Sequence, residues 1–238
     1  MDTPHEPRLA RVAALVADPA RSRMLAVLLS GERATAGELA RAASVTPATA
    51  SGHLAQLLES SFVVCEARGR HRYYRLAGPE VAHALEALAV VAERDVHDRA
   101  WASPSRQRLR WGRCCYGHLA GRLGVALFDA LRQAEGLRVT TQETRGGFEL
   151  TDAGRRWLEA LGLTPPAPTA RRRYAYACLD WSERTDHLGG QLAEALYRHL
   201  TEQGWIHRTE GRAVALTARG HQQLRPHLGP DWDSTRDG

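Results

Sequence analysis

The chain has 238 residues, a formal net charge of +5 and four cysteines. This length suffices for one or two domains with sizeable hydrophobic cores, and the positive charge is compatible with a polyanionic partner. The sequence contains neither the 18 or more consecutive apolar residues of a membrane span nor the apolar stretch of a secretory signal. Together with the few cysteines, this indicates a protein of the reducing cytoplasm rather than a disulfide scaffold or a membrane protein.

Residues 35–58 are expected to form two helices joined by a short turn. Thr35 and Glu38 have the spacing of a capping box at the start of the first helix. The dipeptide Thr46-Pro47 has the pattern of an N-cap followed by proline at the first helical position of the second helix. Two helices with so short a connection are typical of a helix-turn-helix.

The second of these helices is predicted to read DNA. Leu54, Leu57 and Leu58 share one face, whereas the opposite face is polar. In helix-turn-helix proteins the polar face of the second helix enters the major groove. The positions expected to contact DNA are Thr46, Thr49, Ser51, Gly52, His53 and Gln56.

A basic β-hairpin is predicted directly after this helix, with strands over 62–66 and 71–76. Its tip and returning strand carry Arg68, Arg70 and Arg72, which can reach phosphates or a minor groove. The alternative is a protein-interaction module whose charges guard an edge strand. Because the polar helix and the basic hairpin occur in one unit of about forty residues, the pattern favours duplex DNA as partner.

Several motifs of this region resemble the ArsR/SmtB-type repressors, and the resemblance covers roughly residues 8–98. They are Asp18-Pro19-Ala20-Arg21, Gly37-Glu38-Leu39-Ala40, Ser51-Gly52-His53-Leu54 and Tyr73-Tyr74-Arg75-Leu76. The resemblance implies a homodimeric winged-helix regulator, usually a repressor that an effector releases from a palindromic operator. Many members carry arginine where this chain has Gly52, a difference that is expected to shift phosphate binding onto the wing.

The usual metal-sensing positions of the family are not reproduced. The family's cysteine pair is replaced by Glu38-Leu39-Ala40-Arg41, and the helix after the wing does not have the family's ligand spacing. His83 and His97 lie about four helical turns apart, too far to share one ion within a chain. An apolar seam on the same helix is instead expected to pack in a dimer; its residues are Val81, Leu85, Leu88 and Val91.

The C-terminal half contains an internal duplication. Residues 118–127 align with 187–196, and residues 148–154 align with 214–220. Each copy is expected to contain an amphipathic helix, a hairpin and a further helix, with Thr151 and Thr217 as N-caps. The pattern predicts two degenerate winged-helix-like repeats.

The predicted fold class is mainly α with small β-hairpin wings. An ArsR-like DNA-binding and dimerisation domain is expected over 1–100, and a duplicated sensor or assembly domain over 101–229. In the second domain, repeats 106–163 and 170–228 flank a proline-rich linker at 164–169, and residues 230–238 are expected to form a disordered tail.

Cysteine and histidine residues concentrate near the start of each repeat, and pseudo-symmetric packing would bring them together. The candidate sensing residues are Cys114, Cys115, His118, Cys178 and His187. In one interpretation Cys115 and His118 lie on one helix face opposite Cys178 and His187, forming a site for zinc or another thiophilic metal.

Three other interpretations of this cluster remain open. Its thiols could sense oxidants or electrophiles if neighbouring arginines activated them. An organic ligand could be held by the nearby aromatic residues Trp111, Tyr116, Tyr176 and Trp181. The cluster could also be a packed seam between the repeats, because free cysteine is among the most buried residue types.

The function indicated by the sequence is a sequence-specific, dimeric transcriptional regulator, with an effector acting at the C-terminal domain. A non-specific structural DNA-binding protein is an alternative, which salt-dependent binding without a preferred site would reveal. An enzyme carrying a winged helix is a second alternative. The C-terminal half, however, lacks Gly-x-Ser-x-Gly, His-Glu-x-x-His and phosphate-cradling loops.

Overall fold

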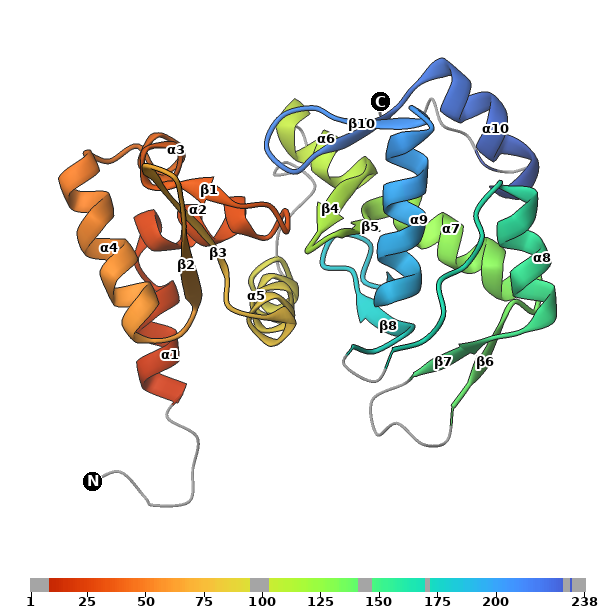
Figure 1. The fold of residues 1–238 in the computed structure, drawn as a ribbon, viewed down its shortest axis with the longest axis horizontal. Coiled ribbons are helices and arrows are strands. Elements are labelled where there is room, and N and C mark those ends of the chain that lie inside the picture. The colour runs from red at the N-terminus through yellow and green to blue at the C-terminus, as the bar shows by residue number, and fades with distance from the viewer. Residues whose placement is uncertain (1–8, 95–102, 141–146, 170–171, 229–231, 233–238) are drawn as a thin grey trace. The chain divides into compact units, whose positions relative to one another are not determined.

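The computed structural model describes residues 9–94, 103–140, 147–169, 172–228 and 232. The chain divides into two compact units, Met1–Ala82 and His83–Gly238 (Figure 1). Helices alternate with short antiparallel strands, and the first unit is a winged helix-turn-helix, as the sequence predicts. The expected boundary near residue 100 and the expected tail, apart from Trp232, lie outside the described residues.

The capping patterns place the helices of the first unit. Thr35 and Glu38 form the predicted capping box: the Thr35 side chain accepts from Glu38 N, and the Glu38 carboxylate accepts from Thr35 N at 2.7 Å. Thr46 caps the next helix by accepting from Thr49 N. The elements are α1 (Leu9–Val16), α2 (Pro19–Leu28), β1 (Ala34–Thr35), α3 (Ala36–Ala43), α4 (Pro47–Glu59), β2 (Val63–Arg68) and β3 (His71–Leu76).

The wing is a regular antiparallel hairpin. Strands β2 and β3 pair from Val63↔Leu76 to Arg68↔His71, and β1 adds to the other edge of β3. Gly69, at φ +59°, supplies the left-handed conformation that a two-residue turn requires. Figure 1 shows α4 beside this hairpin, so the unit presents a helix and a wing together.

Helix α5 (Pro79–Ala92) contains the division between the two units. It begins three residues after the wing strand ends, and from His83 onward it belongs to the second unit. Of the seam predicted on this helix, Leu88 and Val91 are 46% and 60% exposed. Glu86, in contrast, is buried.

The second unit shows one order of elements twice: a hairpin, a helix, a second hairpin and a second helix. The first set, preceded by α6 (Pro104–Trp111), is β4 (Arg113–Cys115), β5 (His118–Ala120), α7 (Gly121–Gln133), β6 (Leu137–Val139), β7 (Phe148–Leu150) and α8 (Asp152–Ala160). The second is β8 (Tyr176–Leu179), β9 (Asp186–Gly189), α9 (Gln191–Glu202), β10 (Ile206–Arg208), β11 (Val214–Leu216) and α10 (Ala218–Leu228).

Equivalent contacts relate the two sets by an approximate two-fold symmetry. Phe148 N donates to Ala175 O at 2.9 Å, and the equivalent Val214 N donates to Gly112 O at 2.8 Å. Helix α7 packs against β9, and α9 packs against β5, so that each set covers the hairpin of the other. Leucines of both helices share one hydrophobic core, which includes Leu123 and Leu192.

The predicted helix caps in this unit are confirmed, but one helix start is not. Thr151 accepts from Gly154 N, and Thr217 accepts from Gly220 N. The segment from His118, expected to be helical, is strand β5, and α7 begins at Gly121. The chain turns tightly at Tyr116-Gly117, where the φ angles are +47° and +95°. A right-handed helix requires negative φ angles, so it cannot include these two residues.

Across the described residues, none of the helices has both the length and the apolar character required to cross a membrane.

Candidate functional site

The polar face of α4 is open to solvent. Of the six positions predicted to contact DNA, five are exposed: Thr46, Thr49, Ser51, Gly52 and Gln56. A Cβ added at Gly52 would meet nothing within 4 Å. The sixth, His53, is half-buried. The helix therefore presents small polar side chains and one open backbone position.

A residue of α2, Arg21, organises this face and was not predicted as a site residue. Its Nη1 donates to Gln56 Oε1 at 2.6 Å and lies 3.4 Å from His53 Nδ1. Asp18, the N-cap of α2, has its Oδ1 3.8 Å from His53 Nδ1. His53 and Gln56 are thus held against α2, and the Asp-Pro-x-Arg motif was the available signal for this arrangement.

The wing carries its positive charge at the tip. Arg68, Arg70 and Arg72 are exposed. Further down the hairpin, Glu66 accepts from Arg75 at 2.8 Å and from Arg33 at 2.9 Å, and these hydrogen bonds lower the pKa of Glu66. These ion pairs offset part of the positive charge at the base of the wing, and Arg70 and Arg72 keep the tip basic.

In the second unit, each N-terminal hairpin pairs a cysteine with a histidine. Cys115 lies opposite His118 across β4 and β5, and Cys178 lies opposite His187 across β8 and β9. Residues directly opposite in an antiparallel ladder point to the same face. The expected helical spacing of Cys115 and His118 is therefore wrong, because the two residues belong to neighbouring strands.

The two hairpins bring four of the five predicted sensing residues together. One ligand atom of each of Cys115, His118, Cys178 and His187 lies within 4.8 Å of every other. All four side chains are buried. Cys114 is buried too but does not belong to this group, since neighbouring residues of a strand point to opposite faces.

The thiols of β4 are in unreactive surroundings. A hydrogen bond with Cys178 and burial raise the pKa of Cys115 to about 12, and burial raises the pKa of Cys114 to about 11. Reactive cysteines are partly exposed and have a lowered pKa. The surroundings of these two thiols therefore do not favour electrophile sensing.

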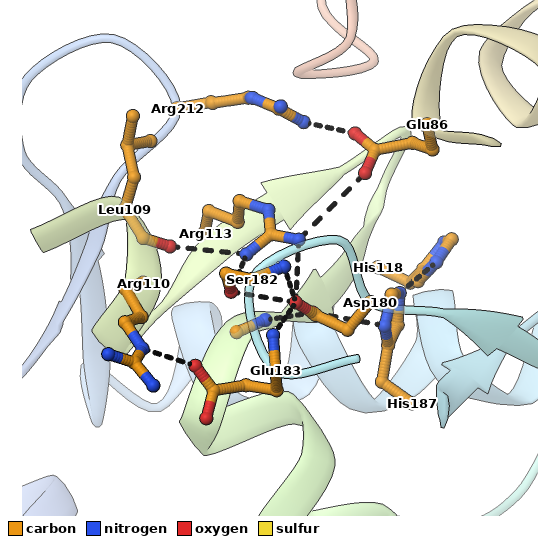
Figure 2. A network of polar contacts seen from close by, with 11 residues as sticks. Glu86, Leu109, Arg110, Arg113, His118, Asp180, Ser182, Glu183, His187 and Arg212 are labelled. Carbon is orange, nitrogen blue, oxygen red and sulfur yellow. Dashed lines mark hydrogen bonds and ion pairs between the residues drawn. The ribbon is translucent and has the colours of Figure 1, made fainter. Parts of the chain in front are cut away.

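The two histidines meet through their Nε2 atoms, 3.1 Å apart. On the far side of its ring, His187 Nδ1 lies 3.2 Å from Asp180 Oδ2 (Figure 2). Burial lowers the pKa of His187, but the contacts with Asp180 and Cys115 outweigh it and raise the pKa to about 9.

Asp180 lies in the loop between β8 and β9 and is completely buried. Its Oδ1 accepts from Arg113 Nη2 at 2.9 Å, and its Oδ2 accepts from Gly121 N at 2.6 Å. Burial alone would raise the pKa of Asp180, yet His187, Arg113 and Gly121 hold it well below its usual range. A charged carboxylate is thus fixed beside the cluster.

The network continues from Asp180 to α5 (Figure 2). The buried Arg113 guanidinium also lies 3.8 Å from Glu86 Oε2, and Glu86 Oε1 is 2.5 Å from Arg212 Nη1. Glu86 and Arg212 were not predicted as site residues. The available signal for Glu86 was a lone acidic residue within the apolar stretch of its helix.

Three of the four aromatic residues considered for an organic ligand serve other contacts. Trp111 packs in the hydrophobic core, and the Arg113 guanidinium lies 4.4 Å from the ring centroid of Trp181. Tyr176 OH lies 2.5 Å from His83 Nε2. These contacts favour a structural role for the three rings.

Comparison with known proteins identifies similar sequences and structures. A family model described as a helix-turn-helix domain matches residues 16–66. The uncharacterized HTH-type transcriptional regulator YdfF of Bacillus subtilis (strain 168) is 37% identical over 224 residues, which cover 93% of this chain and 97% of that protein.

Shorter matches involve the N-terminal part of the chain. The HTH-type transcriptional regulator CmtR of Mycobacterium bovis is 38% identical over 86 residues, or 36% of this chain and 72% of CmtR. The homodimeric winged helix-turn-helix DNA-binding domain of Mb0332 from Mycobacterium bovis, described as a possible ArsR-family regulator, is 29% identical, with a TM-score of 0.35. The matched region covers 37% of this chain and 82% of the Mb0332 domain.

Proposed function

Since the chain belongs to the HTH-type transcriptional regulators, we propose that it acts as an ArsR-type dimeric repressor of genes with a palindromic operator. The first unit binds DNA, and the second unit responds to an effector. We assign the second unit to sensing rather than catalysis.

The observation that carries this proposal is the joint exposure of the α4 polar face and the wing tip. In the proposed complex Thr49 and Ser51 reach base edges in the major groove, and Arg70 binds backbone phosphate. Arg21 fixes the side chain of the exposed Gln56 by a hydrogen bond. Such a division gives sequence preference to α4 and general affinity to the wing.

Dimer formation is supported by the exposed apolar side chains Leu88 and Val91 on α5. Because each side chain is about half exposed, covering it with a second copy would stabilise the dimer by about 1–2 kcal/mol. A two-fold symmetric dimer then requires two half-sites of inverted sequence in the operator.

The test is binding to DNA fragments selected from the protein's own genome, with two arginine variants compared. Arg70→Ala is expected to weaken binding to all sequences. It is also expected to make the negative slope of log K against log salt shallower by about 1, because one phosphate contact is lost. The matched control is Arg138→Ala, which removes an exposed arginine from the β6–β7 hairpin of the second unit and is expected to change neither quantity.

Ser51→Ala is expected instead to change the preferred base at one position of each half-site, by about 1 kcal/mol. If Arg70→Ala and Ser51→Ala both bind selected DNA as the unaltered protein does, the proposed docking is wrong. Uniform binding of all fragments would favour the structural DNA-binding protein considered above.

A further inference from the structure

We propose that the hairpins β4–β5 and β8–β9 together hold one thiophilic divalent cation, with zinc as the first candidate, through Cys115, His118, Cys178 and His187. Occupancy of this site is the effector signal that changes DNA affinity, a consequence that rests on the function proposed above. The site lies outside the positions at which the resemblance places metal ligands.

The distances fit a four-coordinate ion. Zinc bonds of about 2.3 Å to sulfur and about 2.0–2.1 Å to nitrogen place tetrahedral ligand atoms roughly 3.3–3.8 Å apart. The four ligand atoms already lie within 4.8 Å of one another, and the two Nε2 atoms are 3.1 Å apart. Side-chain movements of about an ångström would complete the tetrahedron.

The symmetry of the unit explains why the ligands come in matching pairs. Each hairpin places one thiol and one imidazole on the same face, and the approximate two-fold symmetry repeats the pair. The two-residue turn at Tyr116-Gly117 and the longer loop at 180–185 are compatible with the same cross-strand pairing. Burial of apolar surface alone does not call for two histidines, which are 2% and 0% exposed.

Asp180 provides the outer contact that histidine ligands of metals usually have. A metal-bound histidine donates its other ring N–H to a carboxylate, which fixes the tautomer. Asp180 Oδ2 lies 3.2 Å from His187 Nδ1, on the side of the ring away from the cluster. His187 Nε2 is thereby directed at the proposed ion.

The donor set selects the class of cation. Two thiolates and two imidazoles suit zinc and other soft or borderline ions, whereas magnesium and calcium prefer oxygen ligands. Both cysteines are free and buried, so that neither is placed as an exposed reactive thiol.

The contacts of Asp180 offer a route from the ion to the DNA-binding unit. Asp180 pairs with Arg113, and Arg113 lies 3.8 Å from Glu86 on α5. Because α5 follows the wing strand by three residues, a shift of Glu86 acts on a helix that continues from the wing. Metal binding would bias α5 through this buried charge chain.

The experiment uses the full chain, reduced and made metal-free with a chelator, and Co²⁺ as the spectroscopic probe. We expect one Co²⁺ per chain, with the d–d bands of tetrahedral cobalt and thiolate-to-cobalt charge transfer, and displacement by Zn²⁺. Cys115→Ser and Cys178→Ser are each expected to lose charge-transfer intensity and at least about 10-fold in affinity, since losing even an outer contact costs 10–100-fold.

Cys114→Ser is the matched control, because it removes a buried thiol from the same strand outside the cluster. Cys65→Ser in the wing is a second control, should the first variant fold poorly. Both are expected to keep the tetrahedral spectrum. If the unaltered protein binds no stoichiometric Co²⁺, or if Cys115→Ser and Cys178→Ser bind as it does, the metal site is refuted.

DNA binding of the same preparations is measured separately, with and without Zn²⁺. A tetrahedral site whose occupancy leaves DNA affinity unchanged would refute the regulatory half of the inference. A tetrahedral site in a protein that binds no DNA in either state would refute the proposed function and leave the metal site standing.

Discussion

At the scale of single residues, Gly52 tests how α4 binds DNA. It is exposed within the helix, and an added side chain would meet no atom within 4 Å of its Cβ. Gly52→Arg is therefore expected to strengthen binding to all sequences by adding a phosphate contact, and to steepen the salt dependence by about 1.

Gly52→Ala is the matched control for this prediction. It removes the same glycine without adding charge, and is expected to stabilise the helix by up to about 1 kcal/mol while leaving the salt slope unchanged. DNA affinity measured over a range of salt concentrations distinguishes the two effects. An equal gain in affinity from both substitutions would show that helix stability, not charge, is responsible.

Asp180 is the residue on which the buried network of the second unit depends. Asp180→Asn keeps the shape but leaves Arg113 and His187 without a carboxylate partner in the loop. Removing one member of a buried ion pair costs about 3–5 kcal/mol. The free energy of unfolding of the second unit should fall by this order.

Urea denaturation followed by tryptophan fluorescence measures this change selectively. All six tryptophans of the chain lie after residue 82, so the signal reports the second unit alone. Asp129→Asn, at an exposed carboxylate of α7, is the control and should stay within about 0.5 kcal/mol of the unaltered protein. A similarly small effect of Asp180→Asn would show that Asp180 is dispensable for stability.

The residues that sequence could predict are those with local signals. The helix caps formed by Thr35, Glu38 and Thr46 can be predicted because each involves a partner only three positions away. Glu86 could not be assigned a role, because its partners Arg113 and Arg212 lie 27 and 126 positions further along the chain. Only the packing of the second unit brings these charges together.

At the scale of elements, the hairpin β4–β5 shows how a correct set of residues can come with the wrong local structure. The apolar periodicity of α7 extends backward into residues 118–120, which favoured a longer helix. The tight turn at Tyr116-Gly117 instead makes Cys115 and His118 partners across two strands. Pseudo-symmetric convergence of the two Cys/His pairs was predicted from the duplication, whereas their strand geometry was not.

Helix α5 is the element expected to couple the two units. Glu86→Gln keeps the side-chain shape but removes the charge that faces Arg113 and Arg212. The variant is expected to bind Co²⁺ and, when metal-free, DNA. It is expected to lose the dependence of DNA affinity on metal, which in the unaltered protein should be a change of roughly 5- to 150-fold. Fluorescence anisotropy with a labelled operator measures it.

Glu80→Gln, at the exposed first turn of the same helix, is the control and should retain the full metal dependence. If Glu86→Gln responds to metal as strongly as Glu80→Gln does, the charge chain through α5 is not the route of coupling.

At the scale of the whole molecule, the chain joins a DNA-binding unit that resembles its family to a second unit with its own internal symmetry. The first unit was predictable element by element, because its helices and wing carry local capping and turn signals. In the second unit the repeated sequence predicted a repeated order of helix, hairpin and helix. Its reciprocal contacts, such as those of Gly112 with Val214 and Ala175 with Phe148, arise from long-range packing.

The most direct test of the central claim is a footprint of the purified full chain on its own genomic DNA, metal-free and Zn²⁺-loaded. We predict a discrete protected site with inverted half-sites, whose occupancy changes on loading in the unaltered protein and in Cys114→Ser but not in Cys115→Ser. Protection without any preferred site, or a preferred site equally occupied in both states, would contradict the account of a metal-responsive repressor.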